Sequence, residues 1–569
     1  METINKRRVQ WQDMAFFAVL LAAVAFLLWK CQFGVAKFDE CFYLQIPYRL
    51  YMGDALFVDE WNLCQMSSTL MLPFVSALVS LMGTTDGLVL AMRYVCVLVQ
   101  TAIAITVYLR ARRISPVGAA AAALSFVLYV PYGIMSLSYN SMGIMLMVLA
   151  CTLFLTAQSK ATFIAGGLAF AGAVLCCPYL AAVYGIYLAV VWVKHLVCRR
   201  RGITPEKNDL YSPASALYVT IGAGVAAVAL ITFAFSRAPL GRILEAMPYI
   251  FDDPLHMTRT FWEICKRYAK KLLLFHPQAI KVYAAYVLLV GVTFIDRGRK
   301  KRRWLYFLLS AGCVGVLMDL YFRQSYINYL MWSMSLLAVP MVLLSDEKIC
   351  RRIFWTVWAP GMLYTFCMNA ASDQGLYAIT SSATVSTVGT LIMLAVFVRE
   401  LMADESPILL RRLCAFLAAV MMLFQLGTET ILRYQSVFWE EGGMAAQTVR
   451  MEEGVNKGLM VSESSHDYYH RVVHNLKVLD DYDIEKILYL TNDTTYYFIR
   501  DYEIAAYSTW LSDMGDHTFR QLKGYYELNP EKLPDVVYAE KQHAQLAQRL
   551  ADEIGYTFVD VPGGIVLKK

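Results

Sequence analysis

The sequence predicts a polytopic α-helical membrane protein with about 13 transmembrane helices and a C-terminal extracytoplasmic α/β domain. The first observation is the composition, which is 58% hydrophobic and 17% charged with a mean hydropathy of +0.46, and which excludes an ordinary soluble globule. The second is a series of apolar runs of about 20 residues, the length that spans a bilayer. These runs recur from Met14 to Gly427 and stop after Arg433. The third is the gathering of basic residues in short loops between the runs.

The first apolar run, Met14–Trp29, follows Lys6, Arg7 and Arg8, as the core of a signal peptide would. No small-x-small cleavage site comes after it. We therefore interpret it as an uncleaved first transmembrane helix over residues 14–30.

The remaining crossings follow from the positions of the apolar runs and of Cys177-Pro178, which divides a run too long for one helix. We place them at 88–109, 115–133, 137–157, two within 161–197, 212–235, 277–296, 304–322, 325–345, 353–371, 377–400 and 410–428. The apolar segment 67–83 is predicted to lie on the outer surface, because no basic anchor separates it from the next helix.

With these crossings, every basic cluster falls on one side of the membrane. The clusters are Lys6–Arg8, Arg110–Arg113, Lys194–Arg201, Arg297–Arg303, Lys348–Arg352 and Arg399–Arg412. Under the positive-inside rule that side is the cytoplasm, so the clusters indicate topology and not nucleic-acid binding. The odd number of crossings places the N-terminus inside and the C-terminal domain outside.

Two long loops then lie outside, within a membrane domain of residues 1–432. The first loop, 31–66, is rich in acids. The second, 236–276, is basic although it is external, with Arg237, Arg242 and Arg259 among its bases. An anionic lipid headgroup would explain external bases next to a membrane.

Residues 433–569 carry 14 Lys and Arg against 22 Asp and Glu and are predicted to form the external α/β domain. "KILYLTN" and "DVVYA" are strand-like, "HAQLAQRLADEIG" is helical, and "YTFVDVPGGIVLKK" indicates a terminal hairpin. His466, His470 and His474 share one helix face and could chelate Zn²⁺, but a solvated face is the better interpretation because no HExxH surrounds them. Nothing in the domain resembles a catalytic cluster, so acceptor binding or a cap over the site is expected.

Two function classes are excluded because the sequence lacks the motifs that they need. No nucleotide-binding glycine loop follows a strand, which excludes an ATP-driven pump. The helices lack a chain of buried ions, as a proton-coupled transporter would need. The pairs Asp319/Arg323 and Glu429/Arg433 have i,i+4 spacing and are predicted to lie at the interface.

The first loop opens with "DECFY", and here the sequence resembles the GT-C superfamily of integral-membrane glycosyltransferases, including the aminoarabinose-lipid A and protein mannosyl branches. The family opening has D-E-x-x-Y after the first helix, a Pro-Pro-Leu surface helix ending in Phe-Gly, and an Arg that begins the next helix. Here "SST" and a displaced Pro73 replace Pro-Pro, and Met82 replaces Phe. The matching residues are Asp39, Glu40, Tyr43, Leu70, Gly83 and Arg93.

The resemblance implies an inverting transfer of a sugar from a polyprenyl-phosphate donor, and the residues fit that chemistry. A phosphate is a good leaving group, so the reaction needs one base for the acceptor hydroxyl and cations for the phosphate. We expect Asp39 to be the base, with Glu40 or Asp59 assisting it or binding a divalent metal. The expected substrate-binding residues are Tyr43, Asp59, Glu60, Arg93, Arg237, Arg242 and Arg259, of which the four arginines would bind the lipid phosphate.

The predicted partners are the donor lipid, an envelope lipid, glycan or protein acceptor, and membrane lipids, with no nucleic acid. The predicted location is the plasma membrane. Two alternatives stay open. A lipid or polysaccharide flippase would show a hydrophilic cavity open to both sides. A non-catalytic envelope-assembly protein would use the outer domain only for binding.

Overall fold

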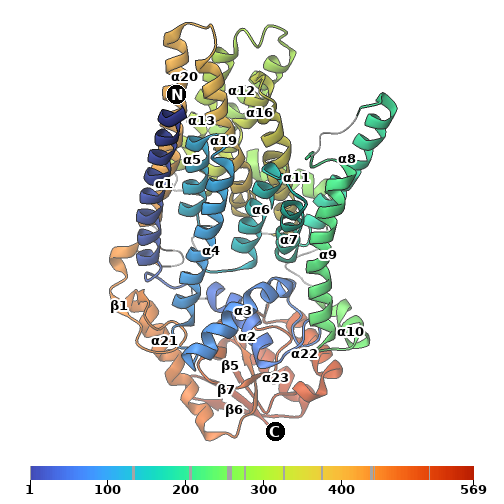
Figure 1. Cartoon of the computed structure of the whole chain (residues 1–569). Coiled ribbons are helices and arrows are strands. Elements are labelled where there is room, and N and C mark those ends of the chain that lie inside the picture. Colours follow the sequence, from blue (N-terminus) through green and yellow to red (C-terminus); the bar gives the residue numbers. More distant parts are fainter. Residues whose placement is uncertain are drawn as a thin grey trace.

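The computed structural model describes residues 2–569 except 37, 131–134, 204–207, 253–258, 274–276, 324–326, 373–375, 436, 438–439, 441 and 512. A helical bundle forms the larger part of the molecule, and the C-terminal domain lies at one end of it (Figure 1). The bundle contains α1 (Glu2–Lys30), α4 (Leu88–Ala111), α5 (Pro116–Leu128), α6 (Tyr139–Leu155), α7 (Lys160–Cys176), α8 (Leu180–Arg201), α9 (Pro213–Phe235), α12 (Pro277–Ile295) and α13 (Arg303–Phe322). It continues with α14 (Ile327–Ser335), α15 (Ala338–Leu344), α16 (Lys348–Ile353), α17 (Ala359–Ala371), α18 (Leu376–Ser382), α19 (Thr384–Met402) and α20 (Ile408–Gln435).

The predicted class of polytopic helical protein is confirmed. Within the described residues, nine helices are long and apolar enough to cross a membrane by length and composition. Several predicted crossings are built from two shorter helices in line, such as α14 with α15. The division at Cys177-Pro178 is confirmed, since α7 ends at Cys176 and α8 begins at Leu180.

Serine and proline residues set where several bundle helices begin. Ser115 caps α5 by accepting a hydrogen bond from the Gly118 N–H, and Pro116 follows at the first helical position. Ser138 forms a capping box with Ser141 at the start of α6. These caps satisfy backbone N–H groups that have no partner inside the helix.

Glycine permits the close contact between α7 and α9. A Cβ atom added to Gly167 would lie 2.2 Å from the Val219 carbonyl oxygen, and one added to Gly222 would lie 2.0 Å from that of Ile164. Small residues of this kind let membrane helices approach backbone to backbone.

Two arginines of the predicted basic clusters form ion pairs at the end of the bundle opposite the C-terminal domain. Arg303 forms ion pairs with Glu400 at 2.6 Å and with Asp404 at 2.8 Å. Arg112 pairs with Asp13 at 2.6 Å, which joins the end of α4 to α1. We refer to this end as the basic end.

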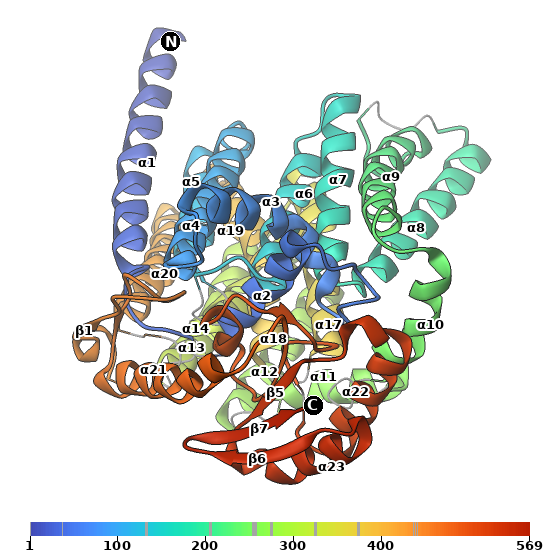
Figure 2. The ribbon, with the colours of Figure 1, turned by 90° about the horizontal axis from the view of Figure 1, so that it is seen from below.

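The two long loops also fold into helices, and the first of these loops lies between the bundle and the C-terminal domain (Figure 1). The first loop contains α2 (Asp39–Met52) and is followed by α3 (Gln65–Met82); the second contains α10 (Leu240–Ile250) and α11 (Phe261–Leu273). By length and composition α3 could cross a membrane, but Figures 1 and 2 show it beside α2, next to the C-terminal domain.

The C-terminal domain is built around a five-stranded sheet in the order β4-β3-β5-β7-β6. β3 (Lys486–Leu490) pairs in parallel with β4 (Glu503–Ile504) and β5 (Val536–Ala539), and β7 (Gly564–Lys568) is antiparallel to β5 and β6 (Thr557–Val561). The predicted strands, helix and terminal hairpin are thus confirmed. The domain also contains α21 (Glu463–Asn475), α22 (Asp516–Leu528), α23 (Ala544–Ile554) and the short pair β1 (Val449–Arg450) and β2 (Met460–Val461).

The core of this domain includes side chains from both loops. Trp61 of the first loop is 4% exposed and stacks on Tyr249 of α10, with ring centroids 4.9 Å apart. It meets Tyr525 of α22 edge to face at 5.3 Å, and the Trp61 backbone N–H donates to the Tyr507 carbonyl at 2.7 Å. The loops and the domain therefore share one hydrophobic core.

Of the two predicted i,i+4 pairs, one forms at an exposed position and the other is buried, so that its predicted interfacial position is wrong. Asp319 and Arg323 form an exposed ion pair at 2.9 Å. Glu429 and Arg433 are instead buried inside the bundle, where Glu429 accepts a hydrogen bond from Ser125 at 3.1 Å and Arg433 donates to the Val130 carbonyl at 3.0 Å. The i,i+4 spacing did not reveal that α20 turns this face toward α5.

Candidate active site

Asp39 and Glu40 open α2, and their side chains have different surroundings. Asp39 is partly exposed, whereas Glu40 is completely buried. Both stand in the first helical turn, where the helix dipole and unpaired N–H groups favour a carboxylate. Of these two adjacent acids, only Asp39 is therefore placed to meet a ligand directly.

Glu40 is held by Arg93 of α4. The Arg93 Nε donates to Glu40 Oε1 at 2.7 Å, and Nη2 donates to Oε2 in a bidentate pair. The Ala36 N–H donates to the same carboxylate at 3.1 Å. Such a pair, both of whose members are buried, fixes the start of α2 against α4.

Arg93 has no N–H donor left after these contacts. Nη1 donates to the carbonyls of Cys31 at 2.7 Å and Phe33 at 3.4 Å, and Nη2 donates to the Gly34 carbonyl at 2.9 Å. A guanidinium has five N–H donors, and all five are used. A lipid phosphate could reach Arg93 only by displacing Glu40 or one of these carbonyls, so Arg93 acts here by positioning the end of α1.

Tyr43 lies one turn beyond Asp39 on the same side of α2. Its ring is buried and meets Tyr139, at the start of α6, edge to face with centroids 5.7 Å apart. This contact anchors α2 on the bundle next to Asp39. A contact of Tyr43 with substrate stays a prediction.

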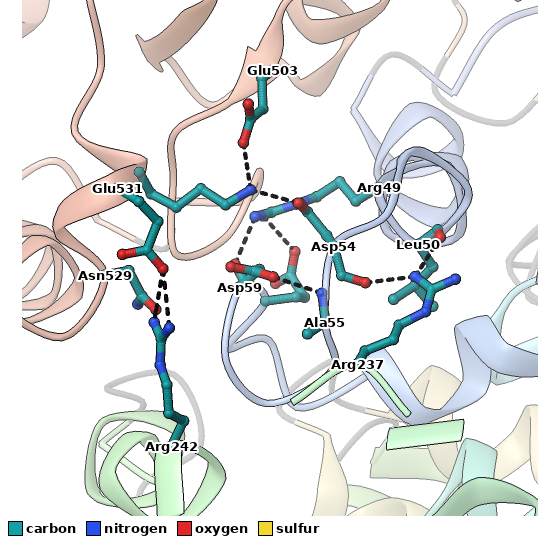
Figure 3. A network of polar contacts seen from close by, with 12 residues as sticks. Arg49, Leu50, Asp54, Ala55, Asp59, Arg237, Arg242, Glu503, Asn529 and Glu531 are labelled. Carbon is teal, nitrogen blue, oxygen red and sulfur yellow. Dashed lines mark hydrogen bonds and ion pairs between the residues drawn. The ribbon is translucent and has the colours of Figure 1, made fainter. Parts of the chain in front are cut away.

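The other acids of the first loop surround Arg49, which is fully buried (Figure 3). Its Nε donates to Asp54 at 2.7 Å, Nη1 donates to Glu60 at 3.0 Å, and Nη2 donates to the Asp59 carbonyl at 2.6 Å. The Asp59 carboxylate accepts the Ala55 N–H at 2.6 Å. These acids fold the loop around one guanidinium.

Lys532 of the C-terminal domain completes the network. Its ammonium lies 2.6 Å from the Asp54 carboxylate and 2.7 Å from that of Glu503, the first residue of β4. A second contact joins the domain to the first loop near the candidate base, where the Thr494 hydroxyl donates to the Phe38 carbonyl at 3.0 Å. The domain is thus tied to α2 at both ends.

Burial changes the acidity of two of these carboxyls. The pKa of Asp59 is raised by desolvation and by the neighbouring Asp54 carboxylate. The pKa of Glu60 is raised by desolvation, which outweighs the opposing effect of the Arg49 guanidinium. Removal from water disfavours the charged form of an acid, which explains both directions.

Arg237 and Arg242, for which phosphate binding stays a prediction, both contact protein groups. Arg237 donates to the carbonyls of Leu50 at 2.6 Å and Asp54 at 2.7 Å, and its guanidinium lies 4.6 Å from the centre of the Phe233 ring. Arg242 donates to Glu531 at 3.0 Å and to the Leu528 carbonyl at 3.1 Å. Figure 3 shows the two arginines reaching the first loop and the C-terminal domain, respectively.

Arg259 stands apart from these two, just before α11. The helix is amphipathic and basic, with Phe261 and Trp262 72% and 75% exposed and Lys266 and Lys270 exposed as well. It is fastened to α17 by two side chains, since the Tyr268 and Thr365 hydroxyls are 2.6 Å apart and Asn369 donates to the Ile264 carbonyl at 3.1 Å. A basic amphipathic helix with exposed aromatic residues is suited to lie at a lipid headgroup layer.

Sequence reasoning missed the two cations at the centre of the network. Arg49 did carry a signal, because it interrupts an otherwise apolar stretch, "LQIPYRLYM". A charge in such a stretch is buried only when it is paired. Lys532 carried none, because its partner Asp54 is 478 positions away.

The acids expected to hold a metal do not converge on one. Glu40 is bound to Arg93, Glu60 to Arg49, and Asp59 to the Ala55 N–H. In the described part of the chain, no three His, Cys, Asp or Glu side chains are grouped as metal ligands, and this includes His466 and His470 of α21.

Comparisons with known proteins find similar solved structures along almost the whole chain. No protein-family model and no curated protein matches the sequence. ArnT from Cupriavidus metallidurans, bound to undecaprenyl phosphate, is similar over 97% of this chain and 97% of its own, with 11% identity and a TM-score of 0.47. The archaeal oligosaccharyltransferase AglB from Archaeoglobus fulgidus, in complex with an inhibitory peptide and a dolichol-phosphate, is similar over 98% of this chain and 74% of its own, with 11% identity and a TM-score of 0.42.

Both are GT-C glycosyltransferases, the superfamily that the "DECFY" motif resembles. At this identity and these TM-scores, the similarity assigns no substrate to this chain and no role to any of its residues.

Proposed function

We propose that this protein is an inverting membrane glycosyltransferase that moves a sugar from a polyprenyl-phosphate donor to an envelope lipid, glycan or protein. The observation that carries the proposal is the division of labour within the Asp39-Glu40 pair. Glu40 forms a buried ion pair with Arg93. This pair holds the partly exposed Asp39 at the junction of the bundle and the C-terminal domain. Solvation of a helix end would not need so rigid a support.

In the proposed reaction, Asp39 is the general base. Its carboxylate takes the proton of the acceptor hydroxyl as the hydroxyl oxygen attacks the anomeric carbon of the sugar. The bond from that carbon to the phosphate oxygen breaks, and its electron pair leaves with the polyprenyl phosphate. A single displacement inverts the anomeric configuration. The chemistry needs no general acid, because the phosphate is already a good leaving group.

The cations that receive the phosphate are assigned to the second loop. We assign the role to Arg259 and to the exposed Lys266 and Lys270 of α11, because they belong to this basic amphipathic helix and the residues just before it. These groups adjoin a helix suited to the headgroup layer, where the phosphate of a donor lipid lies.

The proposed active face is the outer face of the plasma membrane. Arg112 and Arg303 of the basic clusters form ion pairs at the end opposite the C-terminal domain, and the positive-inside rule assigns that end to the cytoplasm. Asp39 and the domain then face outward.

A flippase is the weaker alternative. A cavity of about 1110 Å³ lies between α6–α9 and α16–α17. Its charged lining residues are all near the basic end, and no residue of the first loop or of the C-terminal domain lines it. A translocation pathway would need polar lining toward both faces.

The test uses the full-length chain in liposomes with a synthetic polyprenyl-phosphate sugar and a panel of hydroxyl acceptors. Mass spectrometry should detect free polyprenyl phosphate and a glycosylated acceptor, and NMR of the product should show the inverted anomer. Comparing envelope glycans of cells with and without the protein identifies the natural acceptor. Movement of the donor between leaflets with no sugar transfer would instead establish a flippase.

A further inference from the structure

The large cavity is separate from the candidate active site and has a different chemistry. It opens between α8 and the pair α16–α17, and in Figure 1 α8 leans away from the rest of the bundle. Its deeper walls are apolar and include Met147, Phe154 and Val219. A volume of about 1110 Å³ exceeds that of most small-molecule pockets.

The rim of the cavity is basic. Lys348, Arg351 and Arg352 lie on α16 and are exposed, and Lys194 lies toward the end of α8. One acid, Asp209, sits among these four cations and pairs with Lys194 at 2.5 Å. Among the residues that the structure describes, no ion pair involves Lys348, Arg351 or Arg352. Among its described lining residues, the rim therefore has a net positive charge.

A short segment ties the two sides of the rim together. The Tyr211 hydroxyl donates to the Trp355 carbonyl at 2.7 Å, and the Tyr187 hydroxyl of α8 donates to the Leu210 carbonyl at 2.8 Å. The tyrosine rings add an amphipathic border between the apolar walls and the cations, as aromatic residues do at the surface of a bilayer. The mouth is thus a built structure and not a gap between loosely packed helices.

We infer that this cavity binds an anionic diacyl phospholipid from the leaflet at the basic end. The acyl chains fill the apolar space beside α8, and Arg351 and Arg352 bind the phosphate, which a guanidinium matches with two parallel N–H donors. The donor polyprenyl phosphate is the wrong occupant, because its phosphate must react at Asp39, at the opposite end of the bundle. The bound lipid holds α8 against α16–α17.

The charge test compares two arginine pairs at the same end of the protein. R351Q/R352Q removes the rim charges, and the matched control R110Q/R113Q removes two exposed arginines outside the cavity. Native mass spectrometry and lipid extraction of the detergent-purified full chain should find retained anionic phospholipid in the parent. The rim variant should retain it at least about tenfold less, as expected for one lost charge-assisted contact, and the control should retain it fully.

A second pair of variants tests the apolar part. Val190→Trp fills the cavity from α8, whereas Val193→Trp changes an exposed residue of the same helix that does not line it. Added phosphatidylglycerol should raise the melting temperature of the parent and of Val193→Trp, but not of Val190→Trp, and phosphatidylcholine should raise none of them. Equal retention by both arginine variants, retained polyprenyl phosphate in place of phospholipid, or a parent without lipid would each overturn the inference.

Discussion

Glu40 and Arg93 are 53 positions apart in the chain and form a buried ion pair in which the guanidinium also binds three carbonyls at the end of α1. The pair therefore joins three elements, α1, α2 and α4, at one point. Its neighbour Asp39 gains a fixed position from that junction.

Replacing Glu40 by Gln should destabilise the protein strongly. The change leaves the Arg93 charge buried without a counter-ion, which typically costs about 3–5 kcal/mol. We expect a large fall in the thermal unfolding midpoint of purified protein. Asp319→Asn is the matched control, because it breaks an exposed ion pair worth about 0–1 kcal/mol. Equal melting of the two variants would show that Glu40 does not hold the fold.

Replacing Asp39 by Asn should remove catalysis and leave the fold intact. Asparagine keeps the size and polarity of the side chain but cannot accept the hydroxyl proton. Loss of a general base lowers turnover by about 10²–10⁴, while the thermal midpoint and donor-lipid binding should stay near those of the parent. Sugar transfer in liposomes, measured on the same preparation as the melt, checks this. A folded Asp39→Asn protein with near-normal sugar transfer would show that Asp39 is not the base and only solvates the end of a helix.

The arginines of the second loop should separate into two groups. Arg237→Ala and Arg242→Ala remove hydrogen bonds to the first loop and to the C-terminal domain, so each should lower the thermal midpoint. Arg259→Ala should weaken binding of the donor lipid, by about 1.5–3 kcal/mol for a lost charge-assisted contact. Binding of a labelled polyprenyl-phosphate sugar to purified protein measures this. If Arg259→Ala binds normally, the phosphate site lies elsewhere.

The raised pKa of the Asp59 carboxyl predicts that the stability of the protein depends on pH. The pKa of this carboxyl in the folded protein is raised above the ordinary value of 3.8 by desolvation and by Asp54. The folded state thus binds this proton more tightly than the unfolded state, and the contribution of Asp59 to stability is lost as pH rises through the folded pKa. Asp59→Asn, which still accepts the Ala55 N–H, should therefore gain stability relative to the parent as pH rises. Melting curves from pH 4 to pH 8 test the sign, which a constant difference across that range would contradict.

Topology can be read with two reporters. A reporter fused after Lys569 should be extracytoplasmic, and one inserted within Lys300–Arg303 should be cytoplasmic, because Arg303 lies at the end opposite the C-terminal domain. Both reporters on one side would mean that the number of crossings is wrong by an odd number, with α3 as the first segment to reconsider.

The sequence predicted what depends on local pattern. Apolar runs, the Cys177-Pro178 break and the strand-like "KILYLTN" each carry their signal within a few residues, and the structure confirms them. The site was harder, because its contacts join distant segments. "DECFY" located Asp39, but it could not show that Glu40 is paired with Arg93, or that Arg237 and Arg242 bind carbonyls and carboxylates of the protein. The prediction of an interfacial Glu429 was wrong for the same reason, since only its contact with Ser125 of a distant helix reveals its burial.

The shared core has a consequence for the order in which the protein can be made. Asp54 is synthesised early, and its partner Lys532 is synthesised 478 residues later. Thr494, the partner of Phe38, is likewise synthesised 456 residues after it. Trp61 likewise enters a core whose other members are mostly at the end of the chain. During synthesis the early loop must therefore stand open until translation is nearly complete, since segments made first fold first only where their partners already exist. A ribosome that stops short of β3 would release a membrane bundle with Arg49 and its acids uncovered, a feature by which quality-control proteases could distinguish unfinished chains from finished ones.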